Sequence, residues 1–509
     1  MTAGNILDEV SPLFTNVKNG VAVEENLDKL KWKLKTLTKE DLKFVATRFK
    51  ADNLLGALNT ENESQLSMTC VVLQLLFSGL PAEILLDDNY TTYIRRCLAH
   101  SHSSVKRLGL DELNRHVNDS KLLTLFSSNG EDELLLLVID CLCDEDTAVG
   151  VRATKFIAQL GKNGAGRSLI CQLHFAQKVI EMTRLSQTYQ IRLNEALVEM
   201  SANSGETLRQ LETHGYFKDL VTALKSDDIL ANVTHLEVIT PLGQHWHGYQ
   251  FFSEHGILKV LVDTLVSADS LPLTSIFYPA LVQFFGVLGQ KHCKPLMETY
   301  PQIFDTIFQK ASESIEETIY ITSIEAIGRI LYTRHGKHLL MKDERMINFM
   351  KRVHEGITQD PAEWRVRTLS ALTNIVHVES KDVSSEFANA AKTWFEAMGP
   401  HGFDSVADMA RQPFPDISPA ALQVLDAIAH MKWGQEKISK HRALMDFLFD
   451  DSKELTAESK TAKIALLKTL SSSATAHEIF DKNAYDRIKM AADDVKPNGA
   501  GVLVDSMSV

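Results

Sequence analysis

The segment GKNGAGRS, residues 161–168, has the spacing of a phosphate-binding loop, except that Arg167 stands where that motif has lysine. In such a loop, backbone amides and the lysine hold phosphate groups at the start of a helix that follows a buried strand. Here an amphipathic helical pattern precedes the segment, and Gly166 falls within a repeating pattern described below. We therefore interpret the segment as a turn between helices and expect no nucleotide or other cofactor.

A second group of residues has metal-binding chemistry. It comprises HWH at residues 245–247, His255, and the pair His292-Cys293. Imidazole and thiolate groups are suitable zinc ligands. Their spacing matches no standard metal motif, and the first and last groups fall in equivalent turns of successive repeats. We expect structural or surface histidines and no metal site.

The cysteines offer little further chemistry. The six are scattered, with no C-x-x-C pair, which indicates neither a disulfide framework nor a zinc site. Cys141 and Cys143 lie beside the acidic run CDEDT, whereas thiolates are favoured near positive charge, so we interpret both as buried small hydrophobic residues. The serine-hydrolase, zinc-protease and kinase motifs are absent from the sequence. We expect no catalytic residue and no enzymatic activity.

Charge and hydropathy restrict the partners and the location. The formal net charge of −13 argues against a nucleic-acid partner, because such binding needs basic patches. Residues 29–43 are a basic exception that contains Trp32, but Thr38 followed by Asp41 is typical of a helix cap, and we interpret this segment as a solvated helix. The longest aliphatic run, residues 134–139, is too short to span a bilayer. We expect a soluble protein of the cytosol, or of both the cytosol and the nucleus, without a membrane partner.

Internal repeats organise the chain. Residues 242–261 and 288–307 both begin with Leu-Gly-Gln and align without a gap at an offset of 46 residues. A looser phrase, in which polar residues and a glycine separate two apolar helical patterns, recurs at Gly166, Gly205, Gly248, Gly336 and Gly434. These spacings predict one repeat about every 40 to 49 residues, in or near the range of HEAT or armadillo helix pairs.

A second repeated signal is an apolar residue followed by arginine or lysine at the start of an amphipathic pattern. It occurs at residues 105–106, 151–152, 191–192 and 366–367. We interpret the basic residue as structural, capping or pairing within the turn between helices. In the helix that follows the second of these, we expect Val151, Ala153, Phe156, Ile157 and Leu160 to form the buried face.

These patterns predict an all-α fold, a HEAT or armadillo-like helical-repeat superhelix with a continuous core and one extended concave surface. The low content of glycine and proline, 25 and 13 residues, agrees with helices joined by short turns. We expect a single array of about ten or eleven repeats over residues 1–490, with an irregular N-terminal cap over 1–55. Residues 491–509 lack a helical period and are predicted to be a flexible tail.

The segment RQPFPDISP, residues 411–419, is the most rigid turn in the sequence. Its prolines exclude helix before Ser418, which we expect to cap the next helix with Pro419 at the first helical position. We expect Phe414 to fill the seam between repeats. The partner-binding residues are not evident, and the weakly supported candidates are Phe414, Trp433 and Trp246.

Several segments have residue sequences that a helical repeat does not by itself require. QPFPD at 412–416 with the following AALQV and AIA and with Trp433, SIFYP at 275–279 with FFG at 284–286, and VKP at 495–497 closely resemble the proteasome non-ATPase regulatory subunit 5 family. The resemblance is in phase from about residue 100 to 497 and is weaker before that.

This resemblance implies a non-catalytic assembly chaperone of the base of the proteasome regulatory particle. Family members are helical-repeat proteins that hold particular ATPase subunits through their C-terminal domains, in a module with a large non-ATPase scaffold subunit, and that are absent from the finished proteasome. The alternative is another armadillo-like binding scaffold, such as a transport receptor or a GTPase regulator. That class would share the fold but not the wording of residues 412–416.

Overall fold

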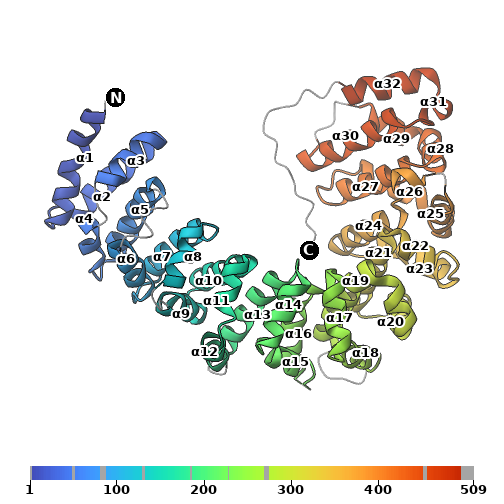
Figure 1. The fold of residues 1–509 in the computed structure, drawn as a ribbon. Helices are drawn as coiled ribbons and strands as arrows, with labels where there is room; N and C mark the ends of the chain where they lie inside the picture. The colour runs from blue at the N-terminus through green and yellow to red at the C-terminus, as the bar shows by residue number, and fades with distance from the viewer. Residues whose placement is uncertain are drawn as a thin grey trace. The chain divides into compact units, whose positions relative to one another are not determined.

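The computed structural model describes residues 3–48, 52–80, 88–128, 132–183, 186–226, 228–268, 274–383, 385–450 and 455–493. Every element within these ranges is a helix (Figure 1), so the all-α prediction is confirmed. The chain forms two compact units, Met1–Leu224 and Lys225–Val509. In the described ranges, no helix is both long enough and apolar enough to cross a bilayer.

The first unit begins with regular helices where we expected an irregular cap. The apolar pattern of residues 1–55 is therefore irregular although the described helices are regular. A capping role for residues 1–55 stays a prediction. The described elements of this unit are α1 (Ala3–Lys18), α2 (Val23–Thr36), α3 (Lys39–Arg48), α4 (Asp52–Leu55), η1 (Gly56–Leu58), α5 (Glu63–Gly79), α6 (Asp88–Leu98), α7 (Ser103–His116), α8 (Ser120–Ser128), α9 (Asp132–Asp140), η3 (Cys141–Cys143), α10 (Thr147–Lys162), α11 (Gly164–Ile170), α12 (Leu173–Thr183), α13 (Gln187–Ser201), α14 (Gly205–Thr213) and α15 (Lys218–Ala223).

The second unit continues the same pattern. Its described elements are α16 (Ile229–Ile239), η4 (Leu242–Gln244), α17 (Trp246–Glu254), α18 (Ile257–Val266), α19 (Thr274–Thr299), α20 (Gln302–Glu313), α21 (Glu317–Tyr332), α22 (Arg334–Leu340), α23 (Arg345–Gln359), α24 (Ala362–Val376), η6 (Ser380–Asp382), α25 (Glu386–Ala397), α26 (Gly402–Arg411), α27 (Ile417–Ala429), α28 (Lys432–Lys440), α29 (Arg442–Leu448), α30 (Ala457–Ser472), α31 (Ala476–Ile479) and α32 (Lys482–Asp493). The last helix extends past residue 490, and the rest of the predicted tail lies outside the described residues.

The repeat has three helices where we expected two. From α10 onward, a long helix is followed by a short helix and then by a third helix, as in α21, α22 and α23; the exception is α19, which bends at His292 and is followed directly by α20. Each long helix packs against the next, which gives the row α19, α21, α24, α27 and α30 in the second unit (Figure 1). The third helices α18, α20, α23, α26 and α29 form a parallel row. The sequence missed the extra helix because the shortest helices, such as α22 with 7 residues, span too few turns to show a period.

The buried face of α10 largely follows the prediction. Ala153, Phe156, Ile157 and Leu160 are buried, but Val151 is 58% exposed, so its assignment to the core was wrong. Successive residues turn about 100° around a helix, which places Val151 opposite the centre of the other four. In α10, the position of a residue around the helix decides its burial, and an apolar residue at the start of the helix need not be buried.

The recurring glycines mark a close contact between two helices of one repeat. A Cβ atom at Gly336 would lie 1.9 Å from the Ile330 carbonyl oxygen at the end of α21. The corresponding distances are 2.3 Å at Gly166, 2.0 Å at Gly248 and 2.0 Å at Gly434. Each of these glycines is the third residue of its short helix, where only glycine permits this approach of backbone to backbone.

Gly205 does not share this position, which corrects the prediction that it belongs to the same phase. It is the first residue of α14, and the third is the buried Thr207. The link between α13 and α14 is longer than the link between α10 and α11, and it includes Ser204, which caps α14 by accepting from the Thr207 amide at 3.2 Å. The longer link leaves room for a side chain.

Two glycines of α11 provide a matched test of this contact. Gly166→Ala is expected to lower the unfolding free energy by about 1–3 kcal/mol, because the new methyl group meets a backbone oxygen that cannot move aside. Gly164→Ala is the control, since its only neighbour within reach of a Cβ is the flexible Arg167 guanidinium at 3.9 Å. Urea unfolding of both variants measures the difference, and equal midpoints would contradict the proposed contact.

Candidate partner-binding surfaces

The repeated basic residues connect neighbouring repeats. Arg152 on α10 binds Asp111 on α7, with Nε to Oδ1 at 2.6 Å. Arg367 on α24 makes two bonds of 2.6 Å to both carboxylate oxygens of Glu325 on α21. The prediction that these residues are structural is confirmed, but the prediction that they act within their own turn was wrong. The partners of Arg152 and Arg367 lie about one repeat earlier in the chain, and the partner of Lys106, Asp144, lies about one repeat later.

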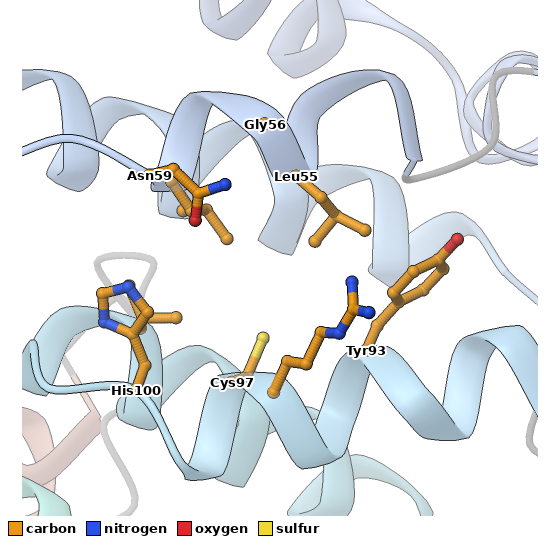
Figure 2. Close-up of a pocket in the computed structure, with 9 residues that line it drawn as sticks. Leu55, Gly56, Asn59, Tyr93, Cys97 and His100 are labelled. Atoms are coloured by element: carbon orange, nitrogen blue, oxygen red, sulfur yellow. The ribbon is translucent and has the colours of Figure 1, made fainter.

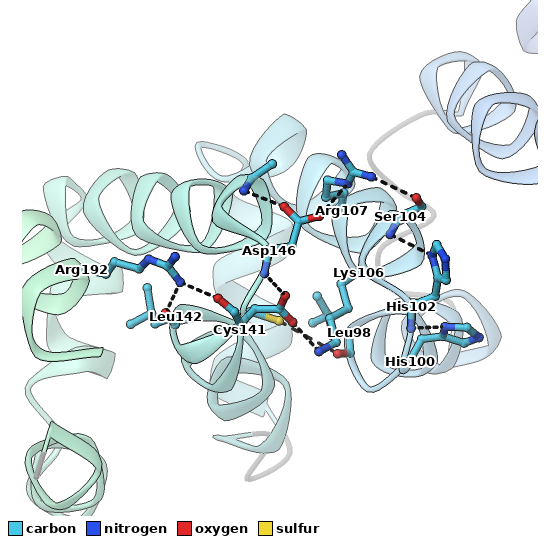
Figure 3. A network of polar contacts seen from close by, with 12 residues as sticks. Leu98, His100, His102, Ser104, Lys106, Arg107, Cys141, Leu142, Asp146 and Arg192 are labelled. Atoms are coloured by element: carbon cyan, nitrogen blue, oxygen red, sulfur yellow. Dashed lines mark hydrogen bonds and ion pairs between the residues drawn. The ribbon is translucent and has the colours of Figure 1, made fainter. Parts of the chain in front are cut away.

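The turn between α9 and α10 is held from both sides (Figure 3). Lys106 on the preceding repeat binds the Asp144 carboxylate at 2.5 Å. Arg192 on the following repeat donates to the carbonyl oxygens of Leu142 at 2.6 Å and Asp144 at 2.9 Å. The guanidinium passes so close to Gly150 that a Cβ there would lie 2.1 Å from it. The acidic run after Cys143 is thus part of a structural joint.

Residues of the glycine-rich segment 161–168 also make contacts with the next repeat. A Cβ at Gly161 would lie 1.7 Å from the Met200 sulfur, so α10 and α13 pack directly at this point. Arg167 donates to Gln210 at 2.6 Å and to the Thr207 hydroxyl at 3.0 Å, both on α14. The arginine that replaces the motif lysine therefore contacts the next repeat, and the segment follows a helix as predicted.

The histidine and cysteine side chains do not form a metal-binding arrangement in the part of the chain that the structure describes. Within the described ranges, no group of three or more His, Cys, Asp or Glu side chains could hold a metal ion. Burial raises the pKa of Cys141 to about 12, which keeps its thiol protonated. Cys143 is exposed, so the prediction that both cysteines are buried holds only for Cys141.

The basic segment forms the exposed side of α2. Trp32 is 68% exposed, while Leu30 and Leu34 are buried against the first unit. Lys29 pairs with Glu25 at 2.6 Å, and Lys33 pairs with Glu9. The predicted cap at Thr38 is confirmed, because its hydroxyl accepts from the Asp41 amide at 3.2 Å. Lysines that pair with nearby carboxylates make a solvated helix face, as predicted.

A small pocket lies between η1 and α6 in the first unit (Figure 2). Its volume is about 290 Å³, and Figure 2 shows Cys97 between Tyr93 and His100. Burial raises the pKa of Cys97 to about 12, so this thiol is a poor nucleophile near neutral pH. The His100 Nδ1 atom accepts a hydrogen bond from the His102 amide at 3.0 Å. This geometry supports no catalytic reaction.

The three candidate aromatic residues have different surroundings. Trp433 is 8% exposed and packs against Phe395 with ring centroids 5.5 Å apart, so it belongs to the core. Phe414 is 51% exposed, and the prediction that it fills a seam between repeats was wrong. Trp246 is 53% exposed. Two of the three candidates therefore present apolar surface to solvent.

The turn at residues 411–419 uses its serine differently from the prediction. Helix α27 begins at Ile417, and Ser418 donates its hydroxyl proton to the Ala410 carbonyl at 2.8 Å instead of capping. Pro419 is the third helical residue. Ser418 is thus a tie between α26 and α27, and this tie holds the chain so that Phe414 stays outside.

Trp246 forms an aromatic cluster with residues far away in the sequence. Its ring stacks on Tyr249 with centroids 5.2 Å apart and planes 14° apart. The buried His292, from α19, contacts both rings at 5.6 and 5.2 Å. His245 and His247 stack on each other at 5.5 Å beside the tryptophan. Sequence analysis identified the histidines as a metal candidate and missed Tyr249, although its spacing of three residues from Trp246 places both on one helix face.

A break in α19 allows this arrangement. His292 has non-helical backbone angles, φ −129° and ψ 37°, where two helical segments meet. Pro295 cannot donate a backbone hydrogen bond to the carbonyl of Lys291 four residues earlier, and its ring disfavours straight helix there. The bend lets His292 Nε2 donate to the Gly243 carbonyl at 3.0 Å. His292 thereby holds the turn before α17 through Gly243 and packs against the Trp246 ring.

The sequence comparisons agree on one family. Residues 8–493 match a family model described as proteasome non-ATPase 26S subunit. The chain belongs to this family. It is 26% identical over 468 residues to the human 26S proteasome non-ATPase regulatory subunit 5, covering 91% of this chain and 92% of that protein. A Drosophila melanogaster protein of the same name is 23% identical over 397 residues, covering 76% of each chain.

Solved structures support the fold. Yeast importin-beta, Kap95p, has a TM-score of 0.56 at 12% identity, with 92% of this chain and 64% of that chain covered. A Kap95:Nup1 complex has a TM-score of 0.57 at 13% identity, with 89% and 55% covered. At these identities the likeness concerns the helical-repeat fold alone. Family membership, in contrast, implies a role in assembly of the proteasome regulatory particle, within a family of non-catalytic chaperones.

The joint between α21 and α24 can be tested by a double-mutant cycle. Because Arg367 binds Glu325 through two short bonds at partly buried positions, the coupling of Arg367→Ala with Glu325→Ala is expected to be about 1 kcal/mol. The control is the pair Lys294 and Glu298, 3.9 Å apart with both side chains about two thirds exposed. Its coupling should stay below about 0.3 kcal/mol in urea unfolding, and equal couplings would contradict the role of the joint.

Proposed function

We propose that this protein is a non-catalytic chaperone that binds ATPase subunits of the proteasome regulatory particle base during assembly, through their C-terminal domains, and leaves before the proteasome matures. The match of residues 8–493 to a proteasome non-ATPase subunit family is the observation that carries this proposal. A large non-ATPase scaffold subunit is the second expected partner. The cytosol, with or without the nucleus, is the expected location.

The architecture suits a steric mechanism. Stacked helices joined by buried long-helix rows and cross-repeat ion pairs resist bending locally, and they present many side chains along one extended surface. A body of 509 residues on an ATPase C-terminal domain would occupy the space that the proteolytic core needs for docking. Release of the chaperone would then permit docking. This mechanism requires binding energy only and no catalytic group.

The alternative is another armadillo-like scaffold, such as a transport receptor or a GTPase regulator. The importin-beta likeness supports the fold and adds nothing to this alternative at 12% identity. The two hypotheses predict different binding partners. A chaperone of the base binds free ATPase subunits and is absent from finished proteasomes, whereas a transport receptor binds its cargo without regard to proteasome assembly.

Co-purification at low salt distinguishes the two. The tagged full-length chain is expected to capture ATPase subunits of the base from cell extract, and to crosslink to a purified ATPase C-terminal domain. Proteasomes purified through a core-particle tag should lack the chain. Mass spectrometry of both purifications is the measurement.

An isolated C-terminal domain from a proteasomal non-ATPase subunit other than the expected scaffold partner serves as the control bait and should not crosslink. Recovery of the chain with mature proteasomes, or failure to capture any ATPase subunit at low salt, would contradict the chaperone proposal. Capture of transport cargo instead would favour the alternative.

A further inference from the structure

The aromatic cluster around Trp246 has an unusual electrostatic setting. The charged groups that act on His245 are His247 and Lys291, and both lower the pKa of His245 in addition to the effect of burial. Burial, and then His245 and Lys291, similarly lower the pKa of His292. Among the described residues, no carboxylate contributes to either shift. In a chain of net charge −13, this is a local surface without an acidic counter-charge.

The acidic side chain of α19 lies beyond the helix break and beside another lysine. Glu298 lies 3.9 Å from Lys294, one turn beyond the helix break. Lys291, on the near side of the break, is exposed, and no described ion pair includes it. The lowered pKa values of His245 and His292 favour their neutral forms, so the positive charge of this surface comes from Lys291. The N–H group of a neutral imidazole can donate a hydrogen bond.

Apolar surface adjoins this positive charge. The Trp246 ring is about half exposed, and its stacking on Tyr249, with His292 below, fixes its orientation. A pre-oriented tryptophan loses little conformational freedom when a partner covers it, which is why such residues often dominate binding energy. Together the two features suit a ligand with an apolar side chain flanked by carboxylates.

We propose that Trp246, Tyr249, Lys291 and the stacked histidines form a docking site for an acidic peptide segment that carries one aliphatic or aromatic side chain. The apolar side chain would pack on the exposed Trp246 ring. The flanking carboxylates would accept hydrogen bonds from Lys291 and from the His245 imidazole. This site deepens the proposed function and rests on it for the identity of the partner, which would be an ATPase subunit of the base.

The first test uses the full-length protein and a fluorescein-labelled peptide in which glutamates flank one leucine. Trp246→Ala and Lys291→Glu are each expected to weaken its binding at least tenfold in fluorescence anisotropy. Trp32→Ala removes another exposed tryptophan, 68% exposed, and should change the affinity less than twofold. Circular dichroism melting shows whether each variant folds.

Three outcomes of this test would overturn the proposal. One is equal binding by wild type and both folded variants. Another is equal binding of a peptide with glutamines in place of glutamates, since charge would then not matter. The third is a tenfold gain in affinity on deletion of residues 494–509, which would mean that the chain's own acidic tail occupies the site.

The second test separates this inference from the proposed function. If wild type binds a purified ATPase C-terminal domain and Trp246→Ala binds tenfold less, both are supported. If wild type and Trp246→Ala bind that domain equally well, the chaperone function stands and the docking site is wrong. If wild type binds no ATPase domain but binds the acidic peptide through Trp246, the site stands and its partner is of another kind.

Discussion

In four repeats, a close contact between the short helix and the backbone just before it constrains the geometry of the repeat. At Gly166, Gly248, Gly336 and Gly434 the backbones approach so closely that no side chain fits between them. This approach sets the angle between the short helix and the helix before it. The third helix then packs against the third helix of the neighbouring repeat. The positions of all surface residues on a repeat follow from that angle.

Polar contacts between repeats add to the close packing of the helices. Arg152, Arg192 and Arg367 each reach from a long helix to the preceding repeat, and the carboxylates or carbonyl groups that receive them differ. Where Gly150 takes the place of an acidic residue, the guanidinium lies across the glycine and continues to the carbonyl groups of the turn. The same basic position thus connects repeats through different partners.

The surface available for binding follows from departures within this regular framework. Pro295 disturbs α19, and the resulting bend at His292 supports a turn that holds Trp246 at the surface. Ser418 ties α27 to α26 and leaves Phe414 exposed. Both exposed aromatic residues stand beside breaks in the helical pattern.

The sequence by itself determined the helical class, the repeat spacing, the buried side of α10 apart from Val151, the Thr38 cap and the family. These follow from local periodicity, capping chemistry and residue order, which act over a few neighbouring residues. Only the tertiary structure decided that the repeat has three helices, that Arg367 pairs with Glu325, that Trp433 is buried while Phe414 is exposed, and that His292 supports Trp246. Three of these, the Arg367 pair, the burial of Trp433 and the support of Trp246, depend on residues about one repeat apart in the chain, and a helical period contains no information about which side chains meet across that distance. The shortest helices span too few turns to show a period, and the exposure of Phe414 accompanies the hydrogen bond from Ser418 to Ala410.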